Sequence, residues 1–181
     1  GYGEELILFK QDGFNNLTGI DPIPEYCQRL KKFYDIECYD KSLSEFAETI
    51  SKEKKFDCII LNHAIEHFVE PDNALEIINN LITENGVLYI RTPDFYKSSK
   101  PFSQFCVHHT FYFSRTTLEN LLKKCGFRVK RYFDNLISDE MVLLVEKGNN
   151  IEPIEYDRGE CKRVFAYLKK NIDIDNERDL K

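Results

Sequence analysis

Short apolar runs alternate along the chain with longer segments in which apolar residues recur every three or four positions. A short apolar run predicts a strand, whereas apolar residues three and four positions apart predict one face of a helix. The predicted strands cover residues 16–21, 36–40, 56–62 and 87–93. The predicted helices cover residues 4–13, 23–33, 42–52, 70–86 and 114–126. This alternation is typical of an α/β fold with a mostly parallel sheet.

The pattern changes near the end of the chain. Residues 127–134 and 140–148 alternate apolar and polar side chains on either side of a short turn, which predicts an antiparallel hairpin. Residues 149–181 are charged, and only 163–170 offer an apolar helical face. We therefore expect one domain over residues 1–148, followed by a tail over 149–181 with one short helix.

Two local features refine these expectations. The segment FDCIILN (56–62) is apolar on both faces, which predicts a central strand. Ser114 and Thr116 are both placed to cap the helix that follows them, since either side chain is of a type that accepts a hydrogen bond from a backbone N–H.

Composition and charge narrow the class of protein. The chain has 181 residues and a formal net charge of −6, which argues against a nucleic-acid partner, because such a partner requires a basic face. No apolar run is long enough to span a membrane, and the sequence GYGEELILFK lacks the features of a signal peptide. Six cysteines without a CxxC pair predict small buried side chains in a reducing cytoplasm.

Candidate chemistry lies where the predicted strands end, because open parallel sheets bind ligands at the carboxyl ends of their strands. These ends carry Asp21, Asp40, Asn62-His63 and Thr92-Pro93-Asp94. The chain begins with Gly1-Tyr2-Gly3 ahead of a helix, and a glycine turn at a helix N-terminus favours an anionic group. Together with an acid at the end of the next strand, this turn predicts a nucleoside-containing cofactor.

These segments resemble class I S-adenosylmethionine-dependent methyltransferases, in the small-molecule type-11/12/23 group. The glycine segment GYG is similar to the end of the family's first motif, TGIDP to the second, and YDKSL to the loop that contacts adenine. The segments FDCIILNHAIEHFVEPDNAL, NLITENGVLYIRTPD and HHTFYFSRTTLENLLKKCGF are similar to the later motifs, in the family's order and spacing. The resemblance covers about residues 1–146. It implies a Rossmann-like sheet whose first strand would precede Gly1 and is therefore expected to be absent from this chain.

The resemblance also implies a set of residues that bind the cofactor, S-adenosyl-L-methionine. Asp21 would hold the ribose hydroxyls, and Asp40 would contact the adenine amine. Asn62 and His63 would line the methionine side. The whole expected set is Gly1, Gly3, Asp21, Pro22, Asp40, Ser42, Leu43 and Asn62.

Histidines are the candidate general bases, because an imidazole titrates near neutral pH. The resemblance places the family's recurring histidine at His109, and His108 and His63 are the alternatives. Of the adjacent pair Glu66-His67, we expect at least one residue to support its loop, because neighbouring residues do not share a helix face. His63 and His67 lack both the H-E-x-x-H order and an evident third ligand, so no metal site is expected. The aromatic residues expected to wall an acceptor pocket are Phe95, Tyr96, Phe102, Phe105, Phe111, Tyr112 and Phe113.

The expected activity is methyl transfer to a small-molecule acceptor, most simply O-methylation of a sugar, a quinone precursor or a similar metabolite. One alternative is a non-catalytic methyltransferase-like subunit that binds a partner. Another is a nicotinamide-dependent short-chain dehydrogenase, which shares the glycine turn and the ribose acid. That enzyme requires Tyr-x-x-x-Lys on a helix, and Tyr96 and Lys100 have this spacing but lie between prolines.

Overall fold

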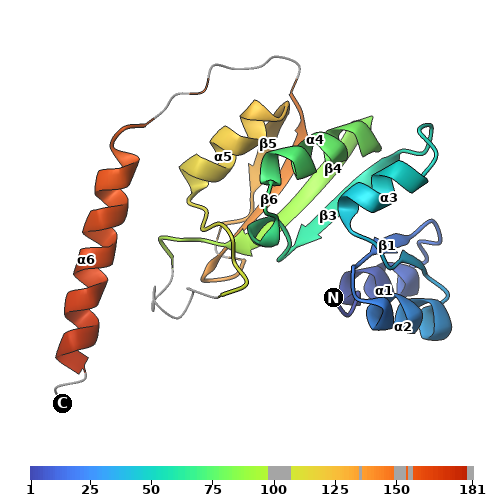
Figure 1. The fold of residues 1–181 in the computed structure, drawn as a ribbon, viewed down its shortest axis with the longest axis horizontal. Helices are drawn as coiled ribbons and strands as arrows, with labels where there is room; N and C mark the ends of the chain where they lie inside the picture. Colours follow the sequence, from blue (N-terminus) through green and yellow to red (C-terminus); the bar gives the residue numbers. More distant parts are fainter. Residues whose placement is uncertain (98–106, 135, 149–153, 155–156, 179–181) are drawn as a thin grey trace. The chain divides into compact units, whose positions relative to one another are not determined.

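The computed structural model describes residues 1–97, 107–134, 136–148, 154 and 157–178. Within these ranges the chain divides into two compact units, residues 1–54 and 55–181. The strands form two sheets, a two-stranded sheet in the first unit and a four-stranded sheet in the second (Figure 1). Among the described residues, no helix combines the length and apolar character needed to cross a membrane.

The first unit is a small α/β unit. Its elements are α1 (Glu4–Gln11), β1 (Thr18–Ile20), α2 (Pro24–Tyr34), β2 (Glu37–Tyr39) and α3 (Leu43–Thr49). The strands β1 and β2 are parallel, with Gly19 opposite Cys38. A core made by α2, the following loop and β2 buries Cys27, Leu30, Ile36 and Cys38, and side chains of α1 pack against it. The predicted order of helices and strands is confirmed here, with boundaries that differ by at most three residues.

The cysteines differ from the expectation of free, buried thiols. Cys27 and Cys38 form a disulfide across the core of the first unit, with their Cα atoms 4.9 Å apart. A separation in this range is normal for a disulfide, and α2 and the parallel strand β2 bring the two residues together. Cys125 is buried as expected, whereas Cys58 and Cys161 are exposed. Cys106 lies outside the described residues.

The second unit carries the larger sheet. Its first elements are β3 (Phe56–Asn62), the 3₁₀ helix η1 (Ile65–His67), α4 (Pro71–Leu81) and β4 (Ile82–Pro93). Its later elements are α5 (Arg115–Lys124), β5 (Phe127–Tyr132), β6 (Glu140–Lys147) and α6 (Glu160–Arg178). The strand order is β3-β4-β6-β5, with β3 parallel to β4 and the other pairs antiparallel. The sheet is therefore mixed, and the predicted hairpin of β5 and β6 is confirmed.

The helices α4 and α5 lie side by side along one face of this sheet (Figure 1). The amide nitrogen of Asn79 on α4 donates to the carbonyl of Cys125 at 2.9 Å, and Lys124 forms an ion pair with Asp72 at 2.9 Å. Fully buried leucines and isoleucines from both helices and from the strands make the core, among them Leu75, Ile78, Leu88, Leu118 and Leu143. This packing holds in place the ends of β3 and β4, which carry the candidate residues His63 and Thr92.

Two predictions for the second unit are wrong. The strand β3 is an edge strand of the described four-stranded sheet, and Asp57 and Cys58 on it are exposed. An apolar run does not by itself distinguish an edge strand from a central one. The helix predicted over 70–86 ends at Leu81, because the backbone becomes extended at Ile82, which is buried beside Phe56 of β3. The Asn85-Gly86 pair falls instead within β4, where the pairing shifts register.

Replacing Ser114 with alanine is expected to destabilise the second unit by about 0.5–2 kcal/mol, the usual cost of losing an N-cap. Ser114 is buried, caps α5 by accepting from the backbone N–H of Thr117, and also donates to Glu160 at 2.5 Å. The matched control is Thr116→Ala, since Thr116 lies inside α5 and does not cap it. Chemical denaturation should show a lower unfolding free energy for Ser114→Ala than for Thr116→Ala, and equal values would contradict the capping role.

Candidate functional site

In the first unit, the glycine segment lies beside Asp21. The Asp21 carboxylate lies beside Gly1 and accepts from the N–H of Ile23 at 2.9 Å. Gly3 has φ +70°, and a Cβ added there would come within 2.7 Å of Leu30. A side chain at Gly3 would be strained and would press on Leu30, so the glycine allows the start of α1 to pack closely against α2. This arrangement fits the expected position of a ribose-binding acid next to a glycine turn.

The second predicted cofactor loop follows β2. Asp40 is exposed, and Ser42 rather than Asp40 caps α3, in a capping box with Glu45. Asp40 therefore does not cap α3, and its exposed carboxylate is available for a ligand. Leu43 is the first residue of α3, and Pro22 is an exposed residue after Asp21. The roles of these residues toward a cofactor stay predictions.

In the second unit, the end of β3 carries a histidine in an unusual backbone conformation. His63 has φ +47°, in the left-handed region that non-glycine residues seldom adopt, and such residues cluster at functional sites. Its ring lies between two carboxylates, with Nδ1 3.1 Å from Glu66 and Nε2 3.0 Å from Glu140. The hydrogen bond with Glu66 raises the pKa of His63, the charge of Glu140 adds to this effect, and burial opposes it. A protonated His63 that donates to both carboxylates is a poor general base.

Glu140 connects this histidine to the neighbouring strand. It is the first residue of β6 and lies opposite Pro93 of β4. Its carboxylate accepts hydrogen bonds from Nε of Arg91, and from Nη2 of Arg91 at 3.1 Å. Burial would raise the pKa of Glu140, but the bonds with Arg91 and His63 outweigh burial and lower it. The sequence did not predict this partner, because 77 residues separate it from His63.

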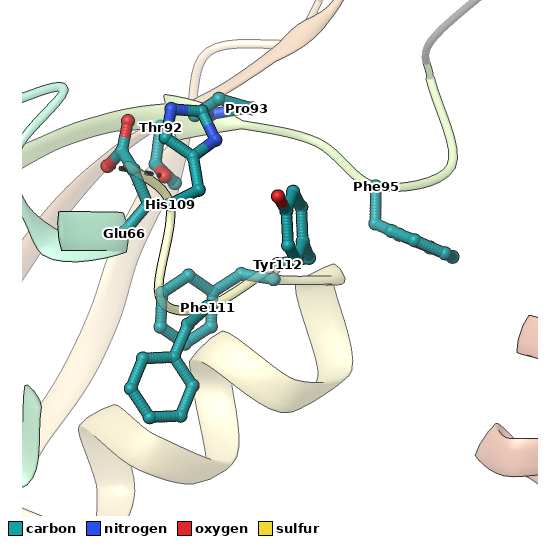
Figure 2. Close-up of a pocket in the computed structure, with 8 residues that line it drawn as sticks. Glu66, Thr92, Pro93, Phe95, His109, Phe111 and Tyr112 are labelled. Atoms are coloured by element: carbon teal, nitrogen blue, oxygen red, sulfur yellow. Dashed lines mark hydrogen bonds between the residues drawn. The ribbon is translucent and has the colours of Figure 1, made fainter. Parts of the chain in front are cut away.

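Glu66 is the centre of the polar cluster. It is 1% exposed, and its carboxylate accepts from Oγ1 of Thr92 at 3.0 Å as well as from His63 (Figure 2). Burial would raise the pKa of Glu66, but the hydrogen bonds with His63 and Thr92 outweigh it and lower the pKa. Its backbone carbonyl accepts from the N–H groups of Thr110 and Phe111, at 2.8 and 3.2 Å. The expectation that one residue of the Glu66-His67 pair supports a loop is confirmed.

His109 lies in the loop that these bonds attach to η1. It lines a small pocket with Glu66, Thr92, Pro93, Phe95, Phe111, Tyr112 and Phe113. Its ring lies beside the Glu66 carboxylate (Figure 2). Its Nδ1 atom is buried without a hydrogen-bond partner in the described part of the chain. Burial lowers the pKa of His109; the charge of Glu66 opposes this effect, and the nearby His67 and His63 add to it. A neutral imidazole with an unused nitrogen is suited to accept a proton or to bind a ligand.

The other histidines and aromatic residues are less directly placed. His108 is exposed, and its backbone carbonyl accepts from Nδ1 of His67 at 2.9 Å. Tyr96 lies outside the pocket lining and donates to Glu160 at the start of α6, at 3.2 Å. Phe102 and Phe105 lie outside the described residues. Of the candidate bases, His109 is therefore the one with both a pocket and an unused ring nitrogen.

The dehydrogenase alternative finds no support in this geometry. Tyr96 lies in a turn rather than on a helix, and its hydroxyl is engaged by Glu160. Lys100 lies outside the described residues. This alternative requires a tyrosine and a lysine on one face of a helix, and Tyr96 is not in a helix.

Comparison with known proteins gives an independent assignment. A family model described as a methyltransferase domain matches residues 1–132, which is more than two thirds of the chain. A comparison with curated protein sequences gave no match. Similar solved structures include an S-adenosylmethionine-dependent methyltransferase from Archaeoglobus fulgidus, with a TM-score of 0.67 and 16% identity, over 81% of this chain and 82% of that one.

Two further solved structures resemble the chain at similar identity. One is the 1,6-didemethyltoxoflavin-N1-methyltransferase of Burkholderia thailandensis, with a TM-score of 0.63 and 16% identity, over 82% of this chain and 68% of that one. The other is the mitomycin 7-O-methyltransferase MmcR, with a TM-score of 0.65 and 17% identity, over 82% of this chain and 47% of that one. The predicted family and fold are confirmed. The chain belongs to the methyltransferase-domain family and shares the Rossmann-like α/β fold of S-adenosylmethionine-dependent methyltransferases.

Proposed function

We propose that this protein transfers the methyl group of S-adenosyl-L-methionine to a hydroxyl oxygen of a small-molecule acceptor, and that His109 accepts the hydroxyl proton. The observation that carries the proposal is the buried Nδ1 of His109, which has no hydrogen-bond partner among the described residues, in a ring whose pKa is lowered chiefly by burial and which lines a small pocket at the end of β4. The family match supplies the reaction class, since two of its structural neighbours are named for O- and N-methyl transfer.

The first unit is proposed to bind the adenosine part of the cofactor. A carboxylate is a strong acceptor for the two ribose hydroxyls. The Asp21 side chain is 16% exposed and lies beside the glycine segment. Asp40 is proposed to accept from the adenine amine, with the backbone of Ser42 and Leu43 beside it. Gly1, Gly3 and Pro22 are proposed to shape the same site, because Gly1 and Pro22 flank Asp21 and Gly3 has φ +70° at the start of α1. Asn62, at the end of β3, is proposed for the methionine side.

The bound cofactor supplies an electrophilic methyl group that is transferred by in-line displacement, so the protein mainly aligns the reactants and excludes water. A hydroxyl acceptor must lose its proton, and a neutral imidazole near neutral pH is suited to take it. His63 is proposed as a positioning residue, because its contacts with Glu66 and Glu140 occupy both ring nitrogens. Glu66 is proposed to hold the loop of His109 through its backbone carbonyl.

Calorimetric titration of the protein with S-adenosylhomocysteine tests the proposal against a non-catalytic subunit. We expect one saturable site, because the product of methyl transfer retains the adenosine and carboxylate groups that the predicted residues would bind. A folded protein that does not bind S-adenosylhomocysteine would favour the non-catalytic subunit. Mass spectrometry of candidate acceptors, incubated with the protein and the methyl donor, would then show whether an oxygen atom gains the methyl group.

A further inference from the structure

The second unit brings two histidines and a buried carboxylate to one place. Ligand atoms of Glu66, His67 and His109 all lie within 4.8 Å of one another. Glu66 and His67 belong to η1, and His109 belongs to the loop that η1 holds through the Glu66 carbonyl. The sequence indicated no metal site because a third ligand was not evident. The fold supplies that ligand from 42 positions further along the chain.

Hydrogen bonds from neighbouring residues hold His67 and Glu66 in fixed orientations, as is usual for metal ligands. A metal-binding histidine usually donates its other ring N–H to a carbonyl or carboxylate, which fixes the ring and its tautomer. His67 does this through Nδ1, which lies 2.9 Å from the carbonyl of His108, and its Nε2 keeps the lone pair. The Glu66 carboxylate is likewise held by Thr92 and His63. Each Glu66 oxygen retains a second lone pair, since a carboxylate has about four acceptor positions.

The ring of His109 is incompletely hydrogen-bonded. Its Nδ1 atom is buried and has no hydrogen-bond partner within the described ranges. A buried ring nitrogen without a partner is rare, which marks this histidine as a candidate ligand. The rings of His67 and His109 meet nearly edge to face, with centroids 4.9 Å apart. Two imidazoles and a carboxylate therefore converge on one small volume.

We propose that Glu66, His67 and His109 form a binding site for a divalent transition-metal ion. Two histidines and one carboxylate are a donor set used for Zn²⁺ and for Fe²⁺, with the remaining positions open to water or substrate. In a tetrahedral site with bonds of about 2.0–2.1 Å, ligand atoms stand about 3.3 Å apart. The ligand atoms lie within 4.8 Å of one another, so binding of an ion would have to draw them up to about 1.5 Å closer together.

This inference concerns the site of the proposed function, because a metal ion and a proton would compete for His109. A bound ion would occupy a lone pair of His109 and remove it as a general base. If the proposed function holds, added Zn²⁺ is expected to inhibit methyl transfer, and a chelator is expected to restore it. If Zn²⁺ instead increases methyl transfer, His109 is a metal ligand during turnover and its role as base is wrong, while the metal site stands.

Direct metal binding tests the site without any methyl-transfer assay. The full-length protein is titrated calorimetrically with Zn²⁺, and separately with Mg²⁺, in the absence of cofactor and acceptor. We expect one tight Zn²⁺ site and no Mg²⁺ binding of similar affinity, because Mg²⁺ prefers oxygen ligands in octahedral geometry. Absence of tight Zn²⁺ binding to the unmodified protein would overturn the proposal.

Variants locate the site. His67→Ala and His109→Ala are each expected to lower Zn²⁺ affinity about 100-fold or more, since even second-layer changes cost 10–100-fold. His67 is exposed, so its loss should leave the protein folded, which circular dichroism would check. The matched control is His108→Ala, which keeps the backbone carbonyl that His67 uses and should bind Zn²⁺ as the unmodified protein does. Equal affinity in His67→Ala and His108→Ala would overturn the assignment.

The two proposals fail in different ways. Loss of Zn²⁺ binding in His67→Ala, together with no methyl transfer to any acceptor, would support the metal site and contradict the proposed function. Methyl transfer without Zn²⁺ binding would support the proposed function and contradict the metal site.

Discussion

Replacing His109 with alanine is expected to lower the turnover number of methyl transfer by about 10²–10⁴-fold, the usual contribution of a general base. Cofactor affinity should change little, because His109 is proposed to act on the acceptor hydroxyl and not to bind the cofactor. The measurement is the rate of methyl transfer at saturating cofactor, with a chelator present so that no metal ion occupies the imidazole. The affinity for S-adenosylhomocysteine is measured by calorimetry alongside it.

The matched control is His108→Ala, because His108 is the adjacent histidine, is exposed, and contributes its backbone carbonyl rather than its ring to the contacts described. Its effect on turnover should be much smaller. Near-normal turnover of His109→Ala between pH 6 and 9 would show that the reaction uses another base or none. A parallel loss of cofactor affinity would show that His109 acts on the cofactor or on the fold.

Replacing Asp21 with alanine is expected to weaken binding of S-adenosylhomocysteine about tenfold to a hundredfold. A contact between a carboxylate and the ribose hydroxyls is a hydrogen bond to a charged group, worth roughly 1.5–3 kcal/mol. Asp21 also accepts from the N–H of Ile23, which gives it a structural role in the turn before α2. Calorimetric titration of the variant measures the ligand contribution, and its thermal melting temperature reports on the turn.

A second variant separates the two roles of Asp21. Asp21→Asn keeps an oxygen that can accept from Ile23, but it loses the charge and one acceptor oxygen. If Asp21 binds the ribose, Asp21→Asn should also bind S-adenosylhomocysteine less tightly than the unmodified protein. If the asparagine variant binds normally while the alanine variant does not, the turn explains the loss and the ribose assignment is wrong.

The parts of the fold that the sequence predicted are those with local signals. Pro71 begins α4 and Ser114 caps α5, because each favours a helix start without help from distant residues. The end of α4 was wrong because the competing signal was not local. The helix ends before Ile82 because this residue pairs with Phe56 on β3, and a periodic apolar pattern does not reveal such a distant partner.

The same distinction applies to the candidate site. His63, His109 and the strand-end acids could be named from their positions along the chain and from the family's motifs. The contacts of Glu140 with His63 and Arg91 could not, because they depend on the antiparallel register of β6 against β4. The central place of Glu66 was missed for a related reason. Its burial and its bonds to Thr92, Thr110 and Phe111 come from three segments that meet only in the folded chain.

The two hydrogen bonds from Thr110 and Phe111 to the Glu66 carbonyl constrain how an acceptor reaches its place. The loop that bears His109 cannot swing outward without breaking both bonds and the contact between His67 and the His108 carbonyl. Any route to the pocket through this loop would displace the imidazole at the same moment. The acceptor would then enter while the loop is open. Its proton could be removed only after these three hydrogen bonds have formed again and returned His109 to its place.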